Sequence, residues 1–407
     1  MTTATVPVTS KIAVLSQPAT KQRIASIDIL RGLVMLIMAI DHVRDFFHHG
    51  HPDPTDLAVT TPFLFFTRWI THFCAPIFVF LSGVSAYLAG TRRTKRELSA
   101  FLIKRGLWLI IIEVVLITFA ISLNPGFNVL ILQVIWAIGG SMVLLGLLVW
   151  LPLPVIGLIG AIVFFGHNLL DLEKINAVNN TLAGKLLFSG HQRDYWPLNS
   201  THKLNIAYAL LPWTGVMLIG YLFGSLYQKS FDAVKRKKVL LYSGLSLFAL
   251  FLVFRYFNIY GDPSPWSVQK STALSIISFL NATKYPSSLL YLCMTLGIAL
   301  VMLALTEKIS NKFTAILVIY GNVPFFYYLC HWYLIKLFNI IVFYASGYNA
   351  NKIVNPHRGN LFQPDDFGFN LFGVYLVWFC VITALYLPCR WYSNYKRTHQ
   401  QWWLSYL

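Results

Sequence analysis

The sequence predicts an all-α polytopic membrane protein with about ten transmembrane helices and with both termini on the cytosolic side. Three observations support this fold class. Of the 407 residues, 57% are hydrophobic and 12% are charged, whereas soluble domains carry about 25% charged residues. The apolar residues gather in runs of roughly 20, the length that crosses a bilayer as a helix. Lys and Arg residues cluster between these runs on alternate connections.

Ten apolar runs are candidates for membrane-spanning helices, each of which needs roughly 20 residues. The runs are 29–47, 63–90, 99–122, 128–150, 153–170, 204–226, 239–258, 286–305, 314–345 and 369–389. The run at 314–345 is too long for one straight span. It contains Gly321 and Pro324, so we expect a break or kink there.

The chain shows no internal repeat, and we expect a single membrane domain over residues 23–390. Residues 1–22 contain no apolar stretch long enough for a signal-peptide core, and we expect a flexible cytosolic tail there. A short cytosolic tail is expected at 391–407. The longest outer loops are expected at about 48–62, 171–203, 259–285 and 346–368.

The net charge of +17 is compatible with nucleic-acid binding, but its distribution favours a membrane. The basic residues lie in short clusters between apolar runs, the pattern of membrane topology. The lipid bilayer is therefore the expected partner, and nucleic acid is not. The five cysteines form no CxxC pair, and no H-E-x-x-H, P-loop or G-x-G-x-x-G motif is present, so we expect no metal and no Rossmann-type nucleotide site.

One face of the first span carries polar side chains at both ends. Residues three or four apart lie on one helix face, and this face holds Asp28, Arg31, Met35, Met38, His42, Asp45 and His49. His42 follows Arg31 by eleven residues, roughly 16 Å along a helix axis. Asp45 lies one turn beyond His42, where a hydrogen bond to the imidazole would fix its tautomer.

Two interpretations of this polar face stay open on the residues alone. Asp28 and Arg31 can pair where the helix enters the membrane, while His42 and Asp45 cap its outer end. Alternatively, the stripe lines a functional polar channel. Ionisable groups this close to a span are unfavourable in lipid and usually functional, which favours the second interpretation.

The same residues carry a resemblance to known families. The opening SIDILRG, the Arg31-x10-His42 spacing and the segment FVFLSGVSAYL, which contains Ser82, resemble the acyltransferase-3 group, in which that histidine is the proposed catalytic base. A closer resemblance is to bacterial membrane proteins related to heparan-α-glucosaminide N-acetyltransferase. It rests on DHVRDFF, RWITHFCAPIFVFLSG, LQVIWAIGGSM, LLPWTGVMLIGYLFG, TKYPSSLLYLCMTLG and VPFFYYLCHWYLI.

One position departs from that second family. The lysosomal enzyme has asparagine where His42 stands and its active histidine in the following loop. Here that loop offers His48, His49 and His51, so either His42 or a loop histidine is the base. The Arg-x10-His spacing favours His42.

The resemblance implies transfer of an acyl group, usually acetyl, from acetyl-CoA or another acyl-CoA in the cytosol to an extracytoplasmic sugar or glycan. It also implies residence in the bacterial cytoplasmic (inner) membrane and no metal. The expected catalytic residues are His42, Asp45 and Asp41. A CoA nucleotide is polyanionic and needs cations at the cytosolic entrance of its binding site. The expected cofactor-binding residues are Arg31, Arg105 and Ser82.

Four further residues are candidates for acceptor binding, each with a plain packing alternative. His72 lies near the outer half of the second span, and His331 lies among aromatic residues that can stack on a sugar ring. Gln133 and Trp136 are spaced i, i+3 and share a face of the predicted fourth helix, where a helix–helix hydrogen bond explains Gln133 equally well. Each residue either binds acceptor or packs between helices.

Three charged residues border an expected outer loop: Arg255, Asp262 and Lys284. They are candidates for contact with the acceptor, but the sequence favours solvated loop positions for them.

Two other functions fit parts of the pattern. A transporter or flippase of a polar or lipid-linked substrate would explain many spans, a broken helix and polar residues at membrane depth. However, matched inverted halves, which would favour transport, are not found in the sequence. A purely structural assembly factor would not need the polar stripe of the first span.

Overall fold

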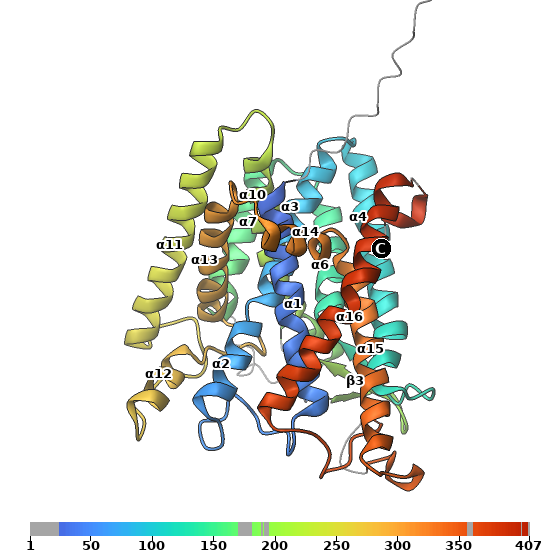
Figure 1. The fold of residues 1–407 in the computed structure, drawn as a ribbon. Coiled ribbons are helices and arrows are strands. Elements are labelled where there is room, and N and C mark those ends of the chain that lie inside the picture. The colour runs from blue at the N-terminus through green and yellow to red at the C-terminus, as the bar shows by residue number, and fades with distance from the viewer. Residues whose placement is uncertain are drawn as a thin grey trace, which may run out of the picture.

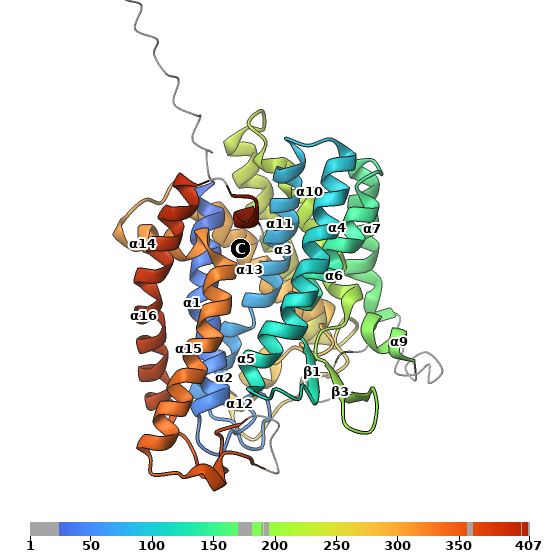
Figure 2. The ribbon, with the colours of Figure 1, turned by 90° about the vertical axis from the view of Figure 1, so that its right-hand side faces the viewer.

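The structure is a computed structural model, and it describes residues 24–169, 181–188, 190, 195–355, 361–399 and 401–405. The predicted tail at 1–22 lies outside these residues. So do parts of the predicted loops at 171–203 and 346–368 and of the tail at 391–407. The described chain is a bundle of roughly parallel and antiparallel helices (Figures 1 and 2).

The elements follow one another along the chain in this order. The α-helices are α1 (Ala25–Phe47), α2 (Pro62–Thr71), α3 (Cys74–Gly90), α4 (Lys95–Ile112), α5 (Thr118–Ser122), α6 (Val134–Leu148), α7 (Leu153–Gly166), α9 (Leu182–Leu187), α10 (Leu210–Gly224), α11 (Ala233–Phe257), α12 (Thr272–Leu280), α13 (Leu289–Thr306), α14 (Lys312–Asn322), α15 (Pro324–Ala345) and α16 (Leu371–Thr398). A π-helix, Glu113–Ile117, joins α4 to α5, and short 3₁₀ turns lie at His167–Leu169, Ser225–Tyr227, Ala350–Lys352 and Trp402–Ser405. The strands are β1 (Val129–Leu132), β2 (Tyr195–Pro197) and β3 (Lys203–Ile206).

Each of the ten predicted runs contains a helix or a pair of helices. Within the described residues, six helical segments are long and apolar enough to cross a membrane: Pro62–Gly90, Leu210–Tyr227, Ala233–Phe257, Leu289–Thr306, Pro324–Ala345 and Leu371–Thr398. The first helix, α1, is not among them, because its sequence includes five charged residues. It is packed against α2, α3, α13, α14, α15 and α16. The mostly helical membrane fold is therefore confirmed, while the number of ten spans stays a prediction.

The predicted break in the run 314–345 is present. Helix α14 ends at Asn322, and α15 begins at Pro324, with Val323 between them in a non-helical conformation. Proline lacks the N–H that a continuous helix would need, and it suits the first turn of a new one. The break places α15 on a separate axis, where it packs against α1 and α16 (Figure 2).

The prediction of an all-α protein is incomplete, because two of the runs begin as β-strands. The strands form one small sheet in the order β1-β3-β2, with Leu130 opposite Leu204 in the parallel β1–β3 pair. These strands lie near one end of the bundle (Figure 2). The runs 128–150 and 204–226 therefore contribute only their later parts to helices α6 and α10. Apolar strands and apolar helices are alike in composition, so a run of hydrophobic residues does not separate them.

Two glycines allow α1 and α14 to approach each other closely. A Cβ on Gly32 of α1 would lie 1.9 Å from the carbonyl oxygen of Leu317, and one on Gly321 of α14 would lie 1.9 Å from that of Asp28. Such small-residue contacts are the usual way in which membrane helices pack tightly. They fix α14, and the break that follows it, against α1.

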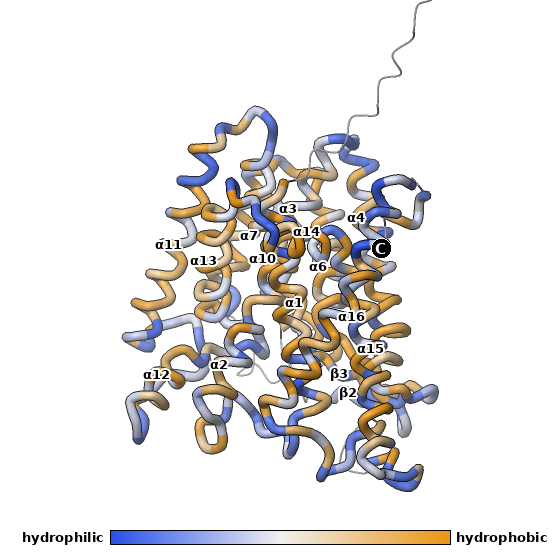
Figure 3. The backbone as a smooth tube through the Cα atoms, in the orientation of Figure 1, coloured by the Kyte–Doolittle hydropathy of each residue, from blue (hydrophilic) through white to orange (hydrophobic). Residues whose placement is uncertain are grey.

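The polar connections lie mainly at the two ends of the bundle, and the apolar residues lie between them (Figure 3). The α3–α4 and α10–α11 connections, which carry the densest basic clusters, lie at the same end as the C-terminal end of α16 (Figure 1). This arrangement agrees with the alternation expected from the sequence. Which end faces the cytosol stays a prediction.

Candidate active site

A small polar pocket lies beside the second half of α1. Its volume is about 60 Å³. Its walls come from α1, the junction of α2 and α3, the start of α6, α15 and two connecting segments. The lining residues are Met38, Asp41, His42, Asp45, Thr71, Cys74, Ala75, Phe78, Gln133, Val134, Ala207, Tyr208, Lys284, Tyr285 and Trp332. Among the described residues that line this pocket, His42 is the sole histidine.

His42 is hydrogen-bonded to a second histidine. Its Nδ1 lies 2.7 Å from Nε2 of His331 on α15, and Nδ1 of His331 contacts the carbonyl oxygen of Tyr328. A carbonyl oxygen only accepts, so in a neutral His331 the proton is on Nδ1 and Nε2 is an acceptor. Nδ1 of His42 must then be the donor. The lone pair of His42 is consequently on Nε2, the nitrogen that bonds to no atom of the described residues.

Aromatic rings hold this histidine pair in place. The imidazole of His42 stacks on Trp332, with ring centroids 4.0 Å apart and 19° between the planes. His331 is fully buried and stacks on Tyr327, with centroids 5.6 Å apart. A ring that is packed on one face and hydrogen-bonded at one nitrogen has little freedom to rotate. The free Nε2 therefore has a fixed direction.

The carboxylates of α1 are paired with arginines rather than with His42. Arg44 donates to Asp41 over 3.1 Å and to Asp45 over 2.6 Å, and Arg68 of α2 also donates to Asp41. The prediction that Asp45 hydrogen-bonds the imidazole is wrong. The adjacent guanidinium provides a charged donor, and the Asp45 side chain, 42% exposed, points to it. The hydrogen-bond partner of His42 is His331 and not Asp45.

The two predicted residues of α6 are close to the site but do not share a helix face. Gln133 lines the pocket as the residue before the helix starts, and its backbone N–H donates to Oε1 of the buried Glu113 over 2.7 Å. Trp136, inside the helix, donates from Nε1 to the carbonyl of Tyr208 over 3.2 Å. The interpretation of an i, i+3 pair on one helix is wrong, because the preceding residues form β1.

The remaining histidine candidates lie away from the pocket lining. His72 is buried at the end of α2, and its carbonyl accepts a hydrogen bond of 2.7 Å from Tyr291. His48, His49 and His51 follow the end of α1. His48 forms a bridge with Phe369, and His49 is exposed. Burial and the neighbouring Arg44 lower the pKa of His48.

The predicted cofactor-binding residues lie toward the other end of α1 or on α4. Arg31 donates to Asp28 over 3.0 Å, to the carbonyl of Gly321 over 3.2 Å and to Oγ of Ser85 over 3.2 Å. The expected Asp28–Arg31 pair is thus present. Ser82 is half-buried one turn before Ser85, and Arg105 is half-buried on α4. The structure does not bring these two residues to Arg31 through any hydrogen bond between described residues.

Sequence reasoning missed Arg44, Arg68 and Trp332, and it favoured a solvated loop position for Lys284, which lines the pocket. Arg44, Arg68, Lys284 and Trp332 all contact or line the pocket. All four lie inside segments that carry the family resemblance, namely DHVRDFF, RWITHFC, TKYPSS and CHWYLI. Their presence in those segments was the one signal available, because no helical spacing links residues from four separate elements.

The fold and the site together define a polytopic membrane protein with a hydrogen-bonded histidine pair at a small polar pocket. The family described as heparan-alpha-glucosaminide N-acetyltransferase, catalytic, matches residues 23–254, more than half of the chain. The chain belongs to this family. Membership indicates a membrane acetyltransferase-type enzyme, and relatives of this type use acetyl-CoA as donor. Membership of this family gives no support to a transport function.

The match confirms the resemblance seen in the sequence. It includes the segments from DHVRDFF to LLPWTGVMLIGYLFG, whereas TKYPSSLLYLCMTLG and VPFFYYLCHWYLI lie after its end at residue 254. The second histidine of the pair, His331, is therefore outside the matched region. No curated protein matches the chain.

Proposed function

We propose that this protein transfers an acetyl group from acetyl-CoA to a hydroxyl or amine of a sugar or glycan, with His42 as general base. The observation that carries this proposal is the hydrogen bond from His42 to His331, which leaves Nε2 of His42 as a fixed, free lone pair at the pocket. A general base must accept the proton of the attacking group from within hydrogen-bond reach. An acetyl-CoA carbonyl and an acceptor that meet in this pocket would satisfy that requirement.

The residues around His42 have separate roles in this proposal. His331 holds the tautomer, and Trp332 holds the ring plane. As the acceptor attacks, Nε2 takes its proton, and the imidazolium then returns a proton to the departing CoA thiolate. The Asp41–Arg44–Arg68 cluster fixes α1 to α2 beside the base. Asp41 and Asp45 therefore support the site through the arginines and are not bases themselves.

The donor is proposed to enter from the end of the molecule that carries the basic connections. That end holds Arg92, Arg93, Lys95 and Arg96 before or at the start of α4, and Lys235 to Lys238 at the start of α11. Arg31 lies on α1 between that end and His42. Cations at the entrance of the donor site attract the polyanionic CoA nucleotide. On this basis we propose a cytosolic basic end, ten spans in one domain over residues 23–390, and a bacterial inner membrane as the location.

The experiment is a direct assay of thioester use. The purified full-length protein in lipid nanodiscs receives acetyl-CoA labelled in its acetyl group, with and without glucosamine or glucose as acceptor. The proposal predicts release of free CoA that increases with an acceptor, and label in the sugar. Uptake of sugar into sealed liposomes without loss of the thioester would contradict it and would favour transport.

A further inference from the structure

The pocket contains one cationic side chain that forms no ion pair with a carboxylate of the described residues. The two pocket carboxylates, Asp41 and Asp45, pair with Arg44 and Arg68. Lys284 also lines the pocket, and within the described residues its ammonium has no ion pair. Its Nζ instead faces the rings of Tyr285, 5.1 Å from the centroid, and Tyr208, 6.0 Å from the centroid.

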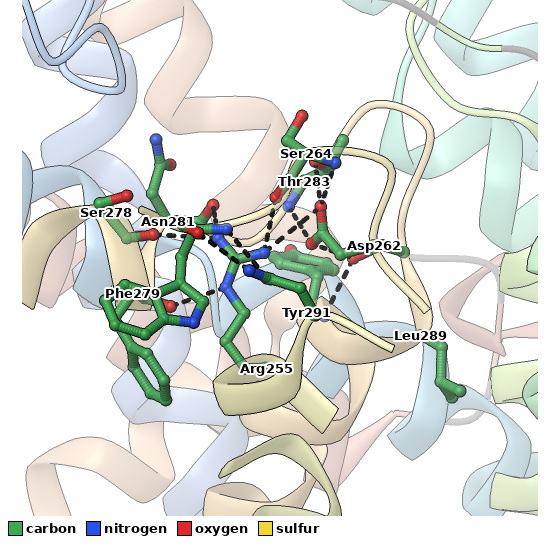
Figure 4. Close-up of polar contacts among 12 residues, drawn as sticks. Arg255, Asp262, Ser264, Ser278, Phe279, Asn281, Thr283, Leu289 and Tyr291 are labelled. Atoms are coloured by element: carbon green, nitrogen blue, oxygen red, sulfur yellow. Dashed lines mark hydrogen bonds and ion pairs between the residues drawn. The ribbon is translucent and has the colours of Figure 1, made fainter. Parts of the chain in front are cut away.

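The segment that carries Lys284 is held by a buried arginine (Figure 4). Arg255, 1% exposed at the end of α11, donates to the carbonyls of Ser278, Phe279 and Asn281 over 2.9 to 3.0 Å. Five donors in a rigid fork suit a guanidinium to this task. The expectation that Arg255 belongs to a solvated outer loop is therefore wrong.

A carboxylate holds the same segment from the other side (Figure 4). Asp262 accepts from the backbone N–H of Thr283 over 2.8 Å, from its hydroxyl over 2.7 Å and from the hydroxyl of Ser288 over 2.9 Å. It also lies 3.7 Å from Arg255. Lys284 is thus flanked on both sides by anchored residues. A lysine stem is flexible, and such anchoring of its backbone is what a preorganised charge requires.

We propose that Lys284 is a second catalytic residue, whose ammonium donates a hydrogen bond to the carbonyl oxygen of the bound thioester. This inference rests on the proposed acetyl transfer. The acceptor oxygen or nitrogen forms a bond to the carbonyl carbon, while His42 Nε2 takes the acceptor proton. The carbonyl electron pair moves to oxygen, where Lys284 stabilises the negative charge. When the carbonyl reforms, the C–S bond breaks, and the thiolate takes the proton from His42.

The shared pocket favours this role over recognition of a remote acidic group. His42 and Lys284 both line this pocket, together with the aromatic residues Tyr285 and Trp332. A base and an oxyanion donor both have to approach one reacting carbonyl, and His42 and Lys284 are placed in the one pocket to do so.

The first test is kinetic and compares Lys284→Met with Lys284→Arg, and with Lys203→Met as a matched control. Lys203 is an exposed lysine of β3 outside the pocket. Loss of one oxyanion donor lowers kcat by about 10²–10³-fold, so we expect that loss for Lys284→Met with little change in the KM for acetyl-CoA. We expect partial activity for Lys284→Arg and full activity for the control. A raised KM for glucosamine with unchanged kcat would overturn the proposal and indicate a binding role toward the acceptor.

The second test needs no acceptor and separates this inference from the proposed function. Difference infrared spectra record the carbonyl stretch of ¹³C-labelled acetyl-CoA bound to a His42→Ala protein, in which the base is absent. A donor at the carbonyl lowers this frequency, and we expect the shift to disappear when Lys284→Met is added but to persist with Lys203→Met. Binding with the same frequency in all variants would overturn the role of Lys284 alone. Absence of acetyl-CoA binding, also by the wild-type protein, would overturn the proposed function and this inference with it.

Discussion

Nδ1 of His42 lies 2.7 Å from Nε2 of His331, although the two residues are 289 positions apart in the chain. The contact joins α1 to α15 at a point that α15 reaches after the break at Val323 and Pro324. Since His331 Nδ1 faces a carbonyl oxygen, the pair has one consistent arrangement of protons when both rings are neutral. A hydrogen bond that defines the tautomer of a catalytic histidine is a recurrent device of acyl-transfer sites.

Replacing His331 is expected to reduce turnover without removing it. In His331→Phe the ring packing persists but the acceptor for His42 Nδ1–H is lost, so both tautomers of His42 become available. We expect kcat to fall by about 10- to 10²-fold, less than the roughly 10²–10⁴-fold that a general base contributes. Steady-state release of CoA measures this loss.

A matched substitution separates a positioning role from a structural one. The carbonyl oxygen of a glutamine at this position can accept from His42 Nδ1–H, so His331→Gln is expected to recover part of the activity that His331→Phe loses. Equal activity of the two variants, at equal thermal stability, would show that the hydrogen bond does not matter.

Turnover is expected to rise with pH. Only a neutral His42 can accept a proton, and an ordinary histidine titrates near about 6.5. The kcat/KM profile should therefore show an ascending limb whose position changes in His331→Gln and changes less in Asp45→Asn, because Asp45 is bonded to Arg44. An ascending limb at the same pH in His331→Gln as in the wild-type protein would contradict the role of His331 as the partner of the base.

Acetyl-CoA is expected to be used from one side of the membrane. The basic connections gather at one end of the bundle (Figure 1), and the positive-inside rule assigns that end to the cytosol. Sealed inside-out vesicles should consume acetyl-CoA added outside, whereas right-side-out vesicles should consume it only after permeabilisation. The reverse result would invert the proposed orientation.

The close contact between α1 and α14 is expected to tolerate no side chain. In Gly32→Ala and Gly321→Ala the new methyl would meet backbone oxygen at 1.9 Å, and overpacking of this kind destabilises by about 1–3 kcal/mol. Gly166→Ala is the matched control, because a Cβ there meets nothing within 4 Å. Thermal unfolding in detergent, followed by tryptophan fluorescence, measures the difference. Equal melting temperatures for the three variants would contradict the described packing.

The sequence predicted the helical bundle and its break better than its boundaries. Hydrophobic runs reveal helices because a spanning helix must be apolar over its whole length, and Pro324 marked the break correctly. The strands β1 and β3 were missed, since Val129–Leu132 and Lys203–Ile206 continue directly into apolar segments. Composition alone could not show that these short segments pair with each other across more than 70 residues.

Helical spacing predicted the part of the candidate site that lies on α1, whereas His331 and Gln133 were recognised as single candidates without their partners. The spacing on α1 identified His42 and the Asp28–Arg31 pair, because helical periodicity relates residues that are close in sequence. The same spacing also suggested Asp45 as the partner of His42, and it could not anticipate that Arg44 would bind that carboxylate. His331 and Arg68 contact pocket residues, and Lys284 lines the pocket, through tertiary packing. A single sequence contains no periodic signal for such contacts.

The most direct test of the account compares His42→Ala with His49→Ala in purified protein reconstituted in nanodiscs. His42 lines the pocket, and His49 is an exposed histidine of the loop that follows α1. With acetyl-CoA and glucosamine as substrates, we expect the CoA release of His42→Ala to fall by about 10²–10⁴-fold at unchanged melting temperature, and that of His49→Ala to equal the wild type. Full activity of a folded His42→Ala protein, with loss in His49→Ala, would contradict the account and place the base in the loop.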